Sequence, residues 1–236
     1  MNFLHRHKNP KQQITIALIG KYVELKDSYK SIAEAFTHAG AACSVEVKLN
    51  WVHSEQVQPD NTEELLAQVD GILVAPGFGS RGIDGKIEAI RYAREKHVPF
   101  FGICLGMQCA VIEFARNVLG LEAAHSTEIK DYTEDPVIDL MEEQKGLADM
   151  GGTMRLGAYP CTLEPESKAA QAYGTLATEE RHRHRYEFND AYREQFIENG
   201  MIPTGTHPDS KLVEIVEVPE HPWFVGAQFH PEYKST

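Results

Sequence analysis

The sequence predicts an α/β fold, a single domain with a mostly parallel central sheet flanked by helices. Short apolar runs of strand character alternate with amphipathic helical stretches along the first half of the chain, a pattern typical of parallel sheets. One of these strands ends in a Gly-x-Cys-x-Gly turn that leads directly into a helix, which is the arrangement of a nucleophile elbow. The 236 residues are also compatible with one hydrophobic core.

The strands and helices of the first half follow from local periodicity. Ile14–Gly20 is β-branched and ends in glycine, Cys43–Val52 alternates apolar and polar residues, and Asp70–Ala75 is a continuous apolar run. Pro99–Ile103 reads as a further buried strand. Three stretches have the 3–4 residue apolar spacing of helices, namely Ser28–Ala39, Ile83–Lys96 and Leu105–Val118.

The second half of the chain is less regular. Between residues 120 and 173 the pattern loosens into glycine, proline and acidic residues, and strand-like runs return at Met201–Thr206, Lys211–Val218 and Trp223–Phe229. We expect residues 1–13 to be an N-terminal linker and residues 14–236 to form the domain.

Composition and charge exclude several classes of protein. A formal net charge of −12 argues against a non-specific nucleic-acid binder, which would need clustered Lys and Arg to neutralise phosphates. The four cysteines show no C-x-x-C spacing, so neither a zinc site nor a redox pair is indicated. Because no signal peptide or membrane-spanning run is present, we expect a cytoplasmic protein without a membrane partner.

Cys104 is the candidate nucleophile. It stands between Gly102 and Gly106, which leave room for a sharp strand-to-helix turn that would expose the thiol at the carboxyl end of the sheet. The helix that follows aims its N-terminal dipole at the sulfur, and this is expected to favour the thiolate. The alternative is a buried apolar cysteine, which is the common fate of a free thiol.

His230 and Glu232 are the candidate base and its orienting group. Side chains two residues apart on an extended chain project to the same side, and Pro231 favours an extended conformation for the residue before it. A His-Pro-Glu triplet alone is weak evidence, but it gains weight here because it follows a predicted strand and accompanies an elbow.

A glycine-rich loop and a basic string complete the candidate features. The loop at residues 75–82 could point backbone N–H groups at an oxyanion together with the N–H of Leu105, or it is simply a flexible turn; it lacks phosphate-binding spacing. The string at residues 181–185 places arginines on one face and histidines on the other if it is extended. It either forms ion pairs with carboxylates or lines a pocket for an anionic or zwitterionic ligand.

These motifs together resemble the class I (triad type) glutamine amidotransferase domain of CTP synthase. The elbow and His-x-Glu occur in all triad amidotransferases, whereas two segments point to CTP synthase in particular. The resemblance covers nearly the whole chain from Ile14 and is carried by GKYVELKDSYKSIAEAF (20–36), GFGSRG (77–82), FFGICLGMQ (100–108), GGTMRLG (151–157), RHRHRYE (181–187) and HPWFVGAQFHPE (221–232), of which GGTMRLG and RHRHRYE are the specific ones.

The resemblance implies a role for individual residues. Cys104 would be the nucleophile, His230 the general base and acid, and Glu232 the group that orients the histidine. Glu128 would suit the ammonium of glutamine and Arg185 its carboxylate. The other implied glutamine contacts are Gly77, Leu105, Gly106, Met107 and Gln108.

The resemblance also implies partners. Members of the family usually carry an N-terminal synthetase domain that binds ATP, magnesium and UTP and aminates UTP with the ammonia. That half is absent from this sequence, so we expect either an excised domain or one that works with a separate synthetase domain. No metal or cofactor is implied for the glutaminase half, although GTP is implied as an allosteric activator, with Arg81 a candidate contact.

Two other functions compete with this interpretation. A γ-glutamyl hydrolase would share the elbow and the histidine, but RHRHRYE and GGTMRLG argue against it. A catalytically silent regulatory or binding module would keep the fold, yet the simultaneous presence of Cys104, His230 and Glu232 argues against it.

Overall fold

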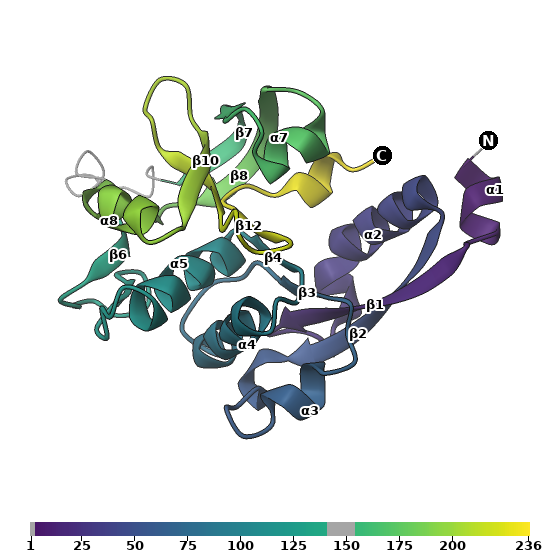
Figure 1. Cartoon of the computed structure of the whole chain (residues 1–236), viewed down its shortest axis with the longest axis horizontal. Helices are drawn as coiled ribbons and strands as arrows, with labels where there is room; N and C mark the ends of the chain where they lie inside the picture. Colours follow the sequence, from purple (N-terminus) through teal and green to yellow (C-terminus); the bar gives the residue numbers. More distant parts are fainter. Residues whose placement is uncertain (1–2, 141–153) are drawn as a thin grey trace.

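The computed structural model describes residues 3–140 and 154–236, and Figure 1 shows a large twisted sheet with helices on both faces. The sheet has nine strands in the order β2-β1-β3-β4-β12-β11-β10-β7-β8. The first five run parallel and the remaining pairings are antiparallel. In sheet order the strands are Val45–His53, Gln12–Gly20, Gly71–Val74, Phe100–Ile103, Phe224–Ala227, Val213–Glu217, Ile202–Thr206, Arg155–Leu163 and Ala177–His184.

Three short strands form a second sheet, and the helices are mostly short. The small sheet has the order β5-β6-β9 and consists of His125–Ser126, Pro136–Asp139 and Glu187–Phe188. The helices are α1 (Phe3–Lys8), α2 (Lys30–Cys43), α3 (Thr62–Leu66), α4 (Ile83–Glu95), α5 (Leu105–Asn117), α7 (Lys168–Tyr173) and α8 (Arg193–Glu198). No helix of the described residues is long and apolar enough to cross a membrane.

Alternation along the parallel strands divides the core between the two faces. In β3, Ile72 and Val74 join the apolar cluster beneath α4 and α5, whereas Leu73 joins the cluster beneath α2. A third cluster lies beneath α7, where the antiparallel strands continue the sheet. Both faces of the central strands are therefore covered, which explains why these strands read as continuous apolar runs.

The predicted α/β class with nucleophile-elbow architecture is confirmed. The antiparallel half of the sheet was predicted less completely from the sequence than the parallel half. The strand Arg155–Leu163 was missed, because glycine and proline interrupt it and every second residue is at least partly exposed. At the N-terminus the first strand begins at Gln12 rather than at residue 14, and residues 3–8 form α1. Whether residues 1–13 serve as a linker stays a prediction.

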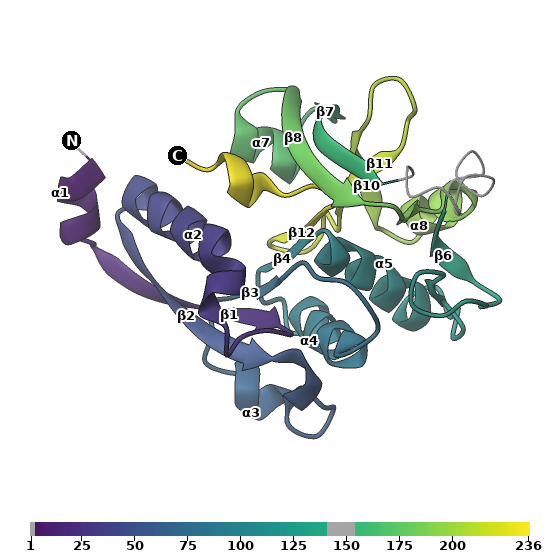
Figure 2. The ribbon, with the colours of Figure 1, turned by 180° about the vertical axis from the view of Figure 1, so that it is seen from behind.

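The C-terminal segment lies between the two halves of the sheet. A 3-10 turn, η5 (Pro231–Lys234), contacts α2 on one side and β8 on the other. Figures 1 and 2 show this segment emerging between α2 and the β7–β8 strands. The chain end that carries the predicted histidine and glutamate is thus held against the centre of the sheet.

One buried ion pair joins the two helices on the α4/α5 face. Arg94 of α4 donates from Nε and Nη2 to the carboxylate of Glu113 on α5, at distances of 2.8 to 3.1 Å. Glu113 is fully buried, and Asn117 also donates to it at 3.1 Å. Losing the guanidinium would leave a buried carboxylate without its counter-charge.

We predict that Arg94→Met lowers the free energy of unfolding by about 3 kcal/mol, measured by urea denaturation. The matched control is Arg91→Met on the same helix. Arg91 pairs with Glu88 and Glu95 through a half-exposed guanidinium, so its loss should lower the free energy of unfolding by less than about 1 kcal/mol. Equal losses from the two substitutions would contradict the importance of the buried pair.

Candidate active site

Cys104 lies at a strained turn between β4 and α5. Its φ of +52° and ψ of −104° belong to a region that side-chain-bearing residues rarely occupy. The flanking glycines permit this turn: a Cβ on Gly102 would lie 2.6 Å from the Gly106 carbonyl carbon, and a Cβ on Gly106 would collide with the Val74 carbonyl oxygen. The Gly-x-Cys-x-Gly spacing is therefore a packing requirement of the elbow, as predicted.

Parallel pairing brings the C-terminal residues to the elbow. β12 pairs with β4 in the register Gly226↔Gly102 and Ala227↔Ile103. The next residue, Gln228, consequently lies beside Cys104, and its Nε2 donates to the sulfur at 3.7 Å. Residues 230 and 232 follow within a few positions, so the two predicted parts of the catalytic group meet at one end of the sheet.

His230 and Glu232 form the predicted pair. The His230 Nδ1 lies 2.9 Å from Glu232 Oε1, and both side chains are buried. A carboxylate can only accept here, so Nδ1 carries the proton and Nε2 keeps its lone pair. Nε2 is buried without a hydrogen-bond partner among the described residues, which leaves it free to take a proton. The ring also stacks on Tyr233, with centroids 5.0 Å apart.

Burial governs the protonation state of the thiol. It raises the pKa of Cys104 to about 12, because a thiolate in this site would lose its hydration, and the carboxylates of Glu128 and Glu232 act in the same direction. The Leu105 N–H and the Lys86 ammonium lower the pKa, but by less. The N–H at the start of α5 thus acts in the direction expected of a helix N-terminus, but burial outweighs it, so the thiol needs a base to accept its proton.

A small cavity gathers the residues expected to recognise an amino acid. Glu128 and Arg185 both line a cavity of about 250 Å³ together with Phe78 of the glycine-rich loop. Burial raises the pKa of Glu128, while the nearby Arg185 lowers it. The Nε of Arg185 is buried and has no hydrogen-bond partner in the described part of the chain. The cavity thus offers one acidic and one basic group.

The other predicted glutamine contacts lie next to Cys104, most of them in the helical turn that follows it. Leu105, Gly106, Met107 and Gln108 form the first turn of α5 and are buried. The Gln108 side chain is directed inward, where its Nε2 donates to Tyr186 O and to Gln228 Oε1, each at 3.2 Å. A substrate would therefore meet the backbone of this turn. Gly77 lies next to it, since a Cβ there would be 3.6 Å from Leu105 Cδ2.

A buried polar network supports the site, and sequence reasoning missed it. Arg155 donates to Glu187 at 3.1 Å and to Glu214 at 2.7 Å. His182 and His184, the histidines of the basic string, lie inside with their ring nitrogens 2.8 Å apart. The buried face of the string thus joins the Arg155 network through two neutral histidines, and Arg185 lines the cavity. The alternation of arginine and histidine in an extended strand was the available signal.

The hydrogen bonds of the histidine pair have a definite direction. His184 Nδ1 donates to Tyr186 O at 3.2 Å, so its Nε2 accepts from His182 Nδ1. His182 Nε2 then faces Glu214 Oε2 at 3.5 Å, and both atoms lack another partner. Burial raises the pKa of Glu214, and a carboxyl proton would satisfy both atoms. This chain ends at Tyr186 O, which also accepts from Gln108 and so connects the network to Gln228.

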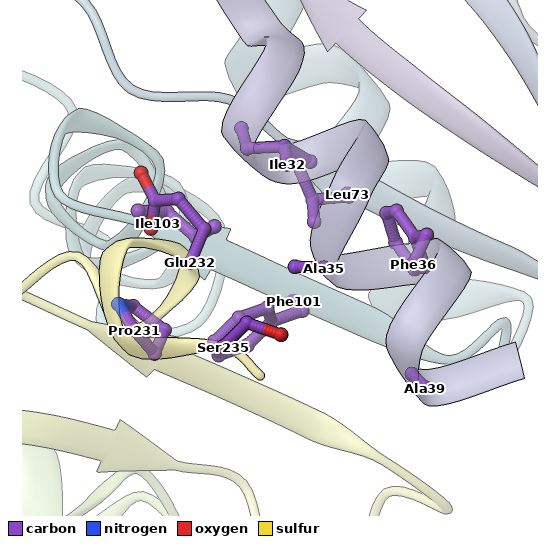
Figure 3. A pocket seen from close by; sticks show the side chains of 10 residues that line it. All are labelled: Ile32, Ala35, Phe36, Ala39, Leu73, Phe101, Ile103, Pro231, Glu232 and Ser235. Carbon is purple, nitrogen blue, oxygen red and sulfur yellow. The ribbon is translucent and has the colours of Figure 1, made fainter. Parts of the chain in front are cut away.

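A second pocket lies on the α2 side and is apolar. It has a volume of about 280 Å³ and opens between α2 and the C-terminal turn, as Figure 3 shows, with the Glu232 carboxylate at its edge. The side chains that α2, β3 and β4 contribute are all apolar, and the C-terminal segment adds Pro231 and the hydroxyl of Ser235. Among the described residues no group of three or more His, Cys, Asp or Glu side chains is arranged to hold a metal ion.

The fold and the site define a cysteine hydrolase of the nucleophile-elbow type, and comparisons with known proteins specify its family. The profile of "Glutamine amidotransferase class-I" matches residues 24–236. CTP synthase of Cytophaga hutchinsonii is 61% identical over 99% of this chain and 43% of its own length. CTP synthase of Clostridium acetobutylicum is 60% identical over 94% of this chain and 42% of its own.

Solved structures agree with these sequence relatives. The glutaminase domain of Trypanosoma brucei CTPS with bound acivicin superposes with a TM-score of 0.89 at 38% identity, covering 94% of this chain and 88% of that one. A glutamine amidotransferase from Thermotoga maritima has a TM-score of 0.54 at 14% identity, over 93% of this chain and 76% of that one, and shows the fold alone.

The chain therefore belongs to the class-I glutamine amidotransferases. Within that family it belongs with the glutaminase domains of CTP synthase, as the sequence motifs predicted. It spans less than half the length of the curated CTP synthases that it matches.

We predict that the buried histidine pair makes the fold acid-sensitive. Burial and Arg155 lower the pKa of His182 to about 2 and that of His184 to about 3. The unfolded chain takes up these protons below about pH 6.5 and the folded chain does not, so stability is lost as pH falls from 6.5. Between pH 7 and 5, His184→Gln should lose about 1–2 kcal/mol less than the unmodified chain, measured by urea denaturation.

The control for this experiment is Arg183→Gln, which changes an exposed neighbour on the same strand and leaves the buried histidine pair intact. If His184→Gln and the unmodified chain lose stability in parallel between pH 7 and 5, the neutral buried pair is contradicted.

Proposed function

We propose that this chain hydrolyses L-glutamine to glutamate and ammonia through a thioester on Cys104. The observation that carries the proposal is the strained Cys104 elbow beside a histidine whose Nδ1 is held by Glu232 at 2.9 Å. That contact leaves His230 Nε2 as a base, and a base is what a thiol with a raised pKa requires.

The reaction follows from these positions. His230 takes the Cys104 proton as the sulfur attacks the side-chain amide carbon of glutamine, and the resulting oxyanion accepts hydrogen bonds from the backbone N–H groups of Gly77 and Leu105. The imidazolium then protonates the amide nitrogen, the C–N bond breaks and ammonia leaves. A water molecule gives its proton to His230 and attacks the thioester, which releases glutamate and returns the proton to sulfur. Glu232 keeps the ring oriented throughout.

Glu128 and Arg185 fit the two ends of an amino-acid substrate. In the 250 Å³ cavity that they share, an ammonium would compensate the half-buried Glu128 carboxyl, and a carboxylate would pair with the Arg185 guanidinium, whose Nε is buried without a partner among the described residues. A zwitterion in the cavity would place a counter-charge beside each group, which supports glutamine rather than a neutral amide as substrate.

The destination of the ammonia is inferred from the relatives. We propose that it serves the ATP-dependent amination of UTP to CTP in a synthetase domain, with ATP, magnesium and UTP bound there and the whole reaction taking place in the cytoplasm. We further propose GTP as an activator. Arg81 is a candidate contact, since it lies in the glycine-rich loop, half exposed, 3.6 Å from Glu55 and over the Tyr22 ring.

We predict that Cys104→Ala abolishes ammonia release, a decrease of at least about 10³-fold, because no other nucleophile can form the thioester. Release would be measured by coupling ammonia to glutamate dehydrogenase. Acivicin, found in the Trypanosoma brucei glutaminase domain, should alkylate Cys104 of the unmodified chain with loss of chloride, which mass spectrometry would detect.

Ammonia release that survives the substitution would disprove the assigned nucleophile. Failure of acivicin to label an otherwise folded, unmodified chain would favour the silent binding module.

We predict that Arg185→Met raises the KM for glutamine by about 10- to 100-fold, because it removes a charge-assisted hydrogen bond to the substrate carboxylate. Arg181→Met is the matched control, as it removes an exposed arginine from the adjoining strand and should leave the KM within about twofold. A KM unchanged by Arg185→Met would exclude the cavity as the carboxylate site.

A further inference from the structure

Lys86 is a buried lysine next to the elbow that the reaction scheme above does not use. It lies on α4, is 1% exposed, and donates from Nζ to the Ala75 carbonyl oxygen at 2.8 Å. No carboxylate among the described residues forms an ion pair with it. An ammonium in this setting is unfavourable, because it has lost its hydration and gained in return the Ala75 carbonyl as its acceptor among the described residues.

The ammonium lies directly under the predicted oxyanion hole. A Cβ on Gly77 would be 3.8 Å from Lys86 Nζ and 3.6 Å from Leu105 Cδ2, so the amine and the first turn of α5 flank the same loop residue. A second lysine, Lys21, which follows β1, donates to the Phe78 carbonyl oxygen at 2.6 Å. Ammonium groups thus hold the carbonyl two residues before Gly77 and the carbonyl one residue after it.

Stability does not explain a positive charge at this position. Replacing an unpaired buried charge with an apolar side chain of the same shape is neutral or stabilising in a protein interior. Negative charge, however, appears beside Lys86 during catalysis, first as the Cys104 thiolate and then as the tetrahedral oxyanion. A fixed ammonium in a water-excluded site stabilises both without reorganisation.

We propose that Lys86 is a positioning residue for the oxyanion hole: it anchors the loop at Ala75 and supplies the positive field in which the Cys104 thiolate and the oxyanion form. This proposal rests on the proposed glutaminase function for its second half, the oxyanion, but the effect on the thiol can be measured without glutamine.

The charges around Lys86 define its pH dependence. The titratable groups that act on it are Cys109 of α5, Cys104 at the elbow and Lys21 just after β1. Burial and the like charge of Lys21 lower the pKa of Lys86 to about 8, and the two cysteines oppose this when ionised. The field should accordingly be present below pH 8 and fade above it.

The test is Lys86→Met, which keeps the length of the side chain and removes its charge. Alkylation of Cys104 by iodoacetamide would be followed from pH 6.5 to 10, with the modified cysteine located by peptide fragmentation. We expect Lys86→Met to slow alkylation about 10-fold below pH 8, because it raises the pKa of the thiol. The two proteins should converge above pH 9. Lys86→Arg should retain most of the rate, and Lys96→Met, an exposed lysine just beyond the same helix, should match the unmodified chain.

Two further measurements separate this role from a structural one. The melting temperature of Lys86→Met should equal or exceed that of the unmodified chain, whereas kcat for glutamine should fall about 10- to 100-fold with little change in KM. An unchanged alkylation rate, or a loss that is the same at every pH, would overturn the proposal. If alkylation responds as expected but the unmodified chain releases no ammonia, the field at Cys104 is established and the glutaminase function is the part that fails.

Discussion

Parallel pairing of β4 with β12 is the constraint on which the site depends. The two strands are more than 120 residues apart in the chain, yet their register sets Ala227 beside Ile103 and so places Gln228 against the Cys104 sulfur. A slip of one residue would turn every side chain of β12 to the other face. His230 follows Gln228 by two residues, so the pairing holds the His230–Glu232 pair at the same end of the sheet as Cys104.

The polar network beneath the elbow explains why the antiparallel strands of the second half carry buried charged and polar side chains. Arg155 on β7 and His182 on β8 reach Glu214 on β11, so one cluster connects three antiparallel strands. Through Tyr186 O and Gln108 the same cluster continues to Gln228 and the sulfur. Because a half-satisfied buried network is unfavourable, its members hold one another in place, and with them the orientation of the thiol.

Electrostatics at the site oppose a permanently charged nucleophile. Burial and two carboxylates keep the thiol protonated, while Lys86, the Leu105 N–H and His230 are arranged to accept or stabilise the charge once it forms. A protonated thiol is a weak nucleophile, so reaction at Cys104 requires a base that accepts the proton.

The sequence by itself determined the α/β class, the elbow at Cys104 and the His230–Glu232 pair, because these depend on local periodicity, on two glycines that sterics require, and on residues two positions apart. It also determined the family, through motifs such as RHRHRYE. Only the tertiary structure decided which face of that string is buried, that Glu128 and Arg185 share a cavity, and that Lys86 lies under the loop at Gly77. These facts arise from contacts between distant segments and from loss of solvent, neither of which leaves a periodic signal in the chain.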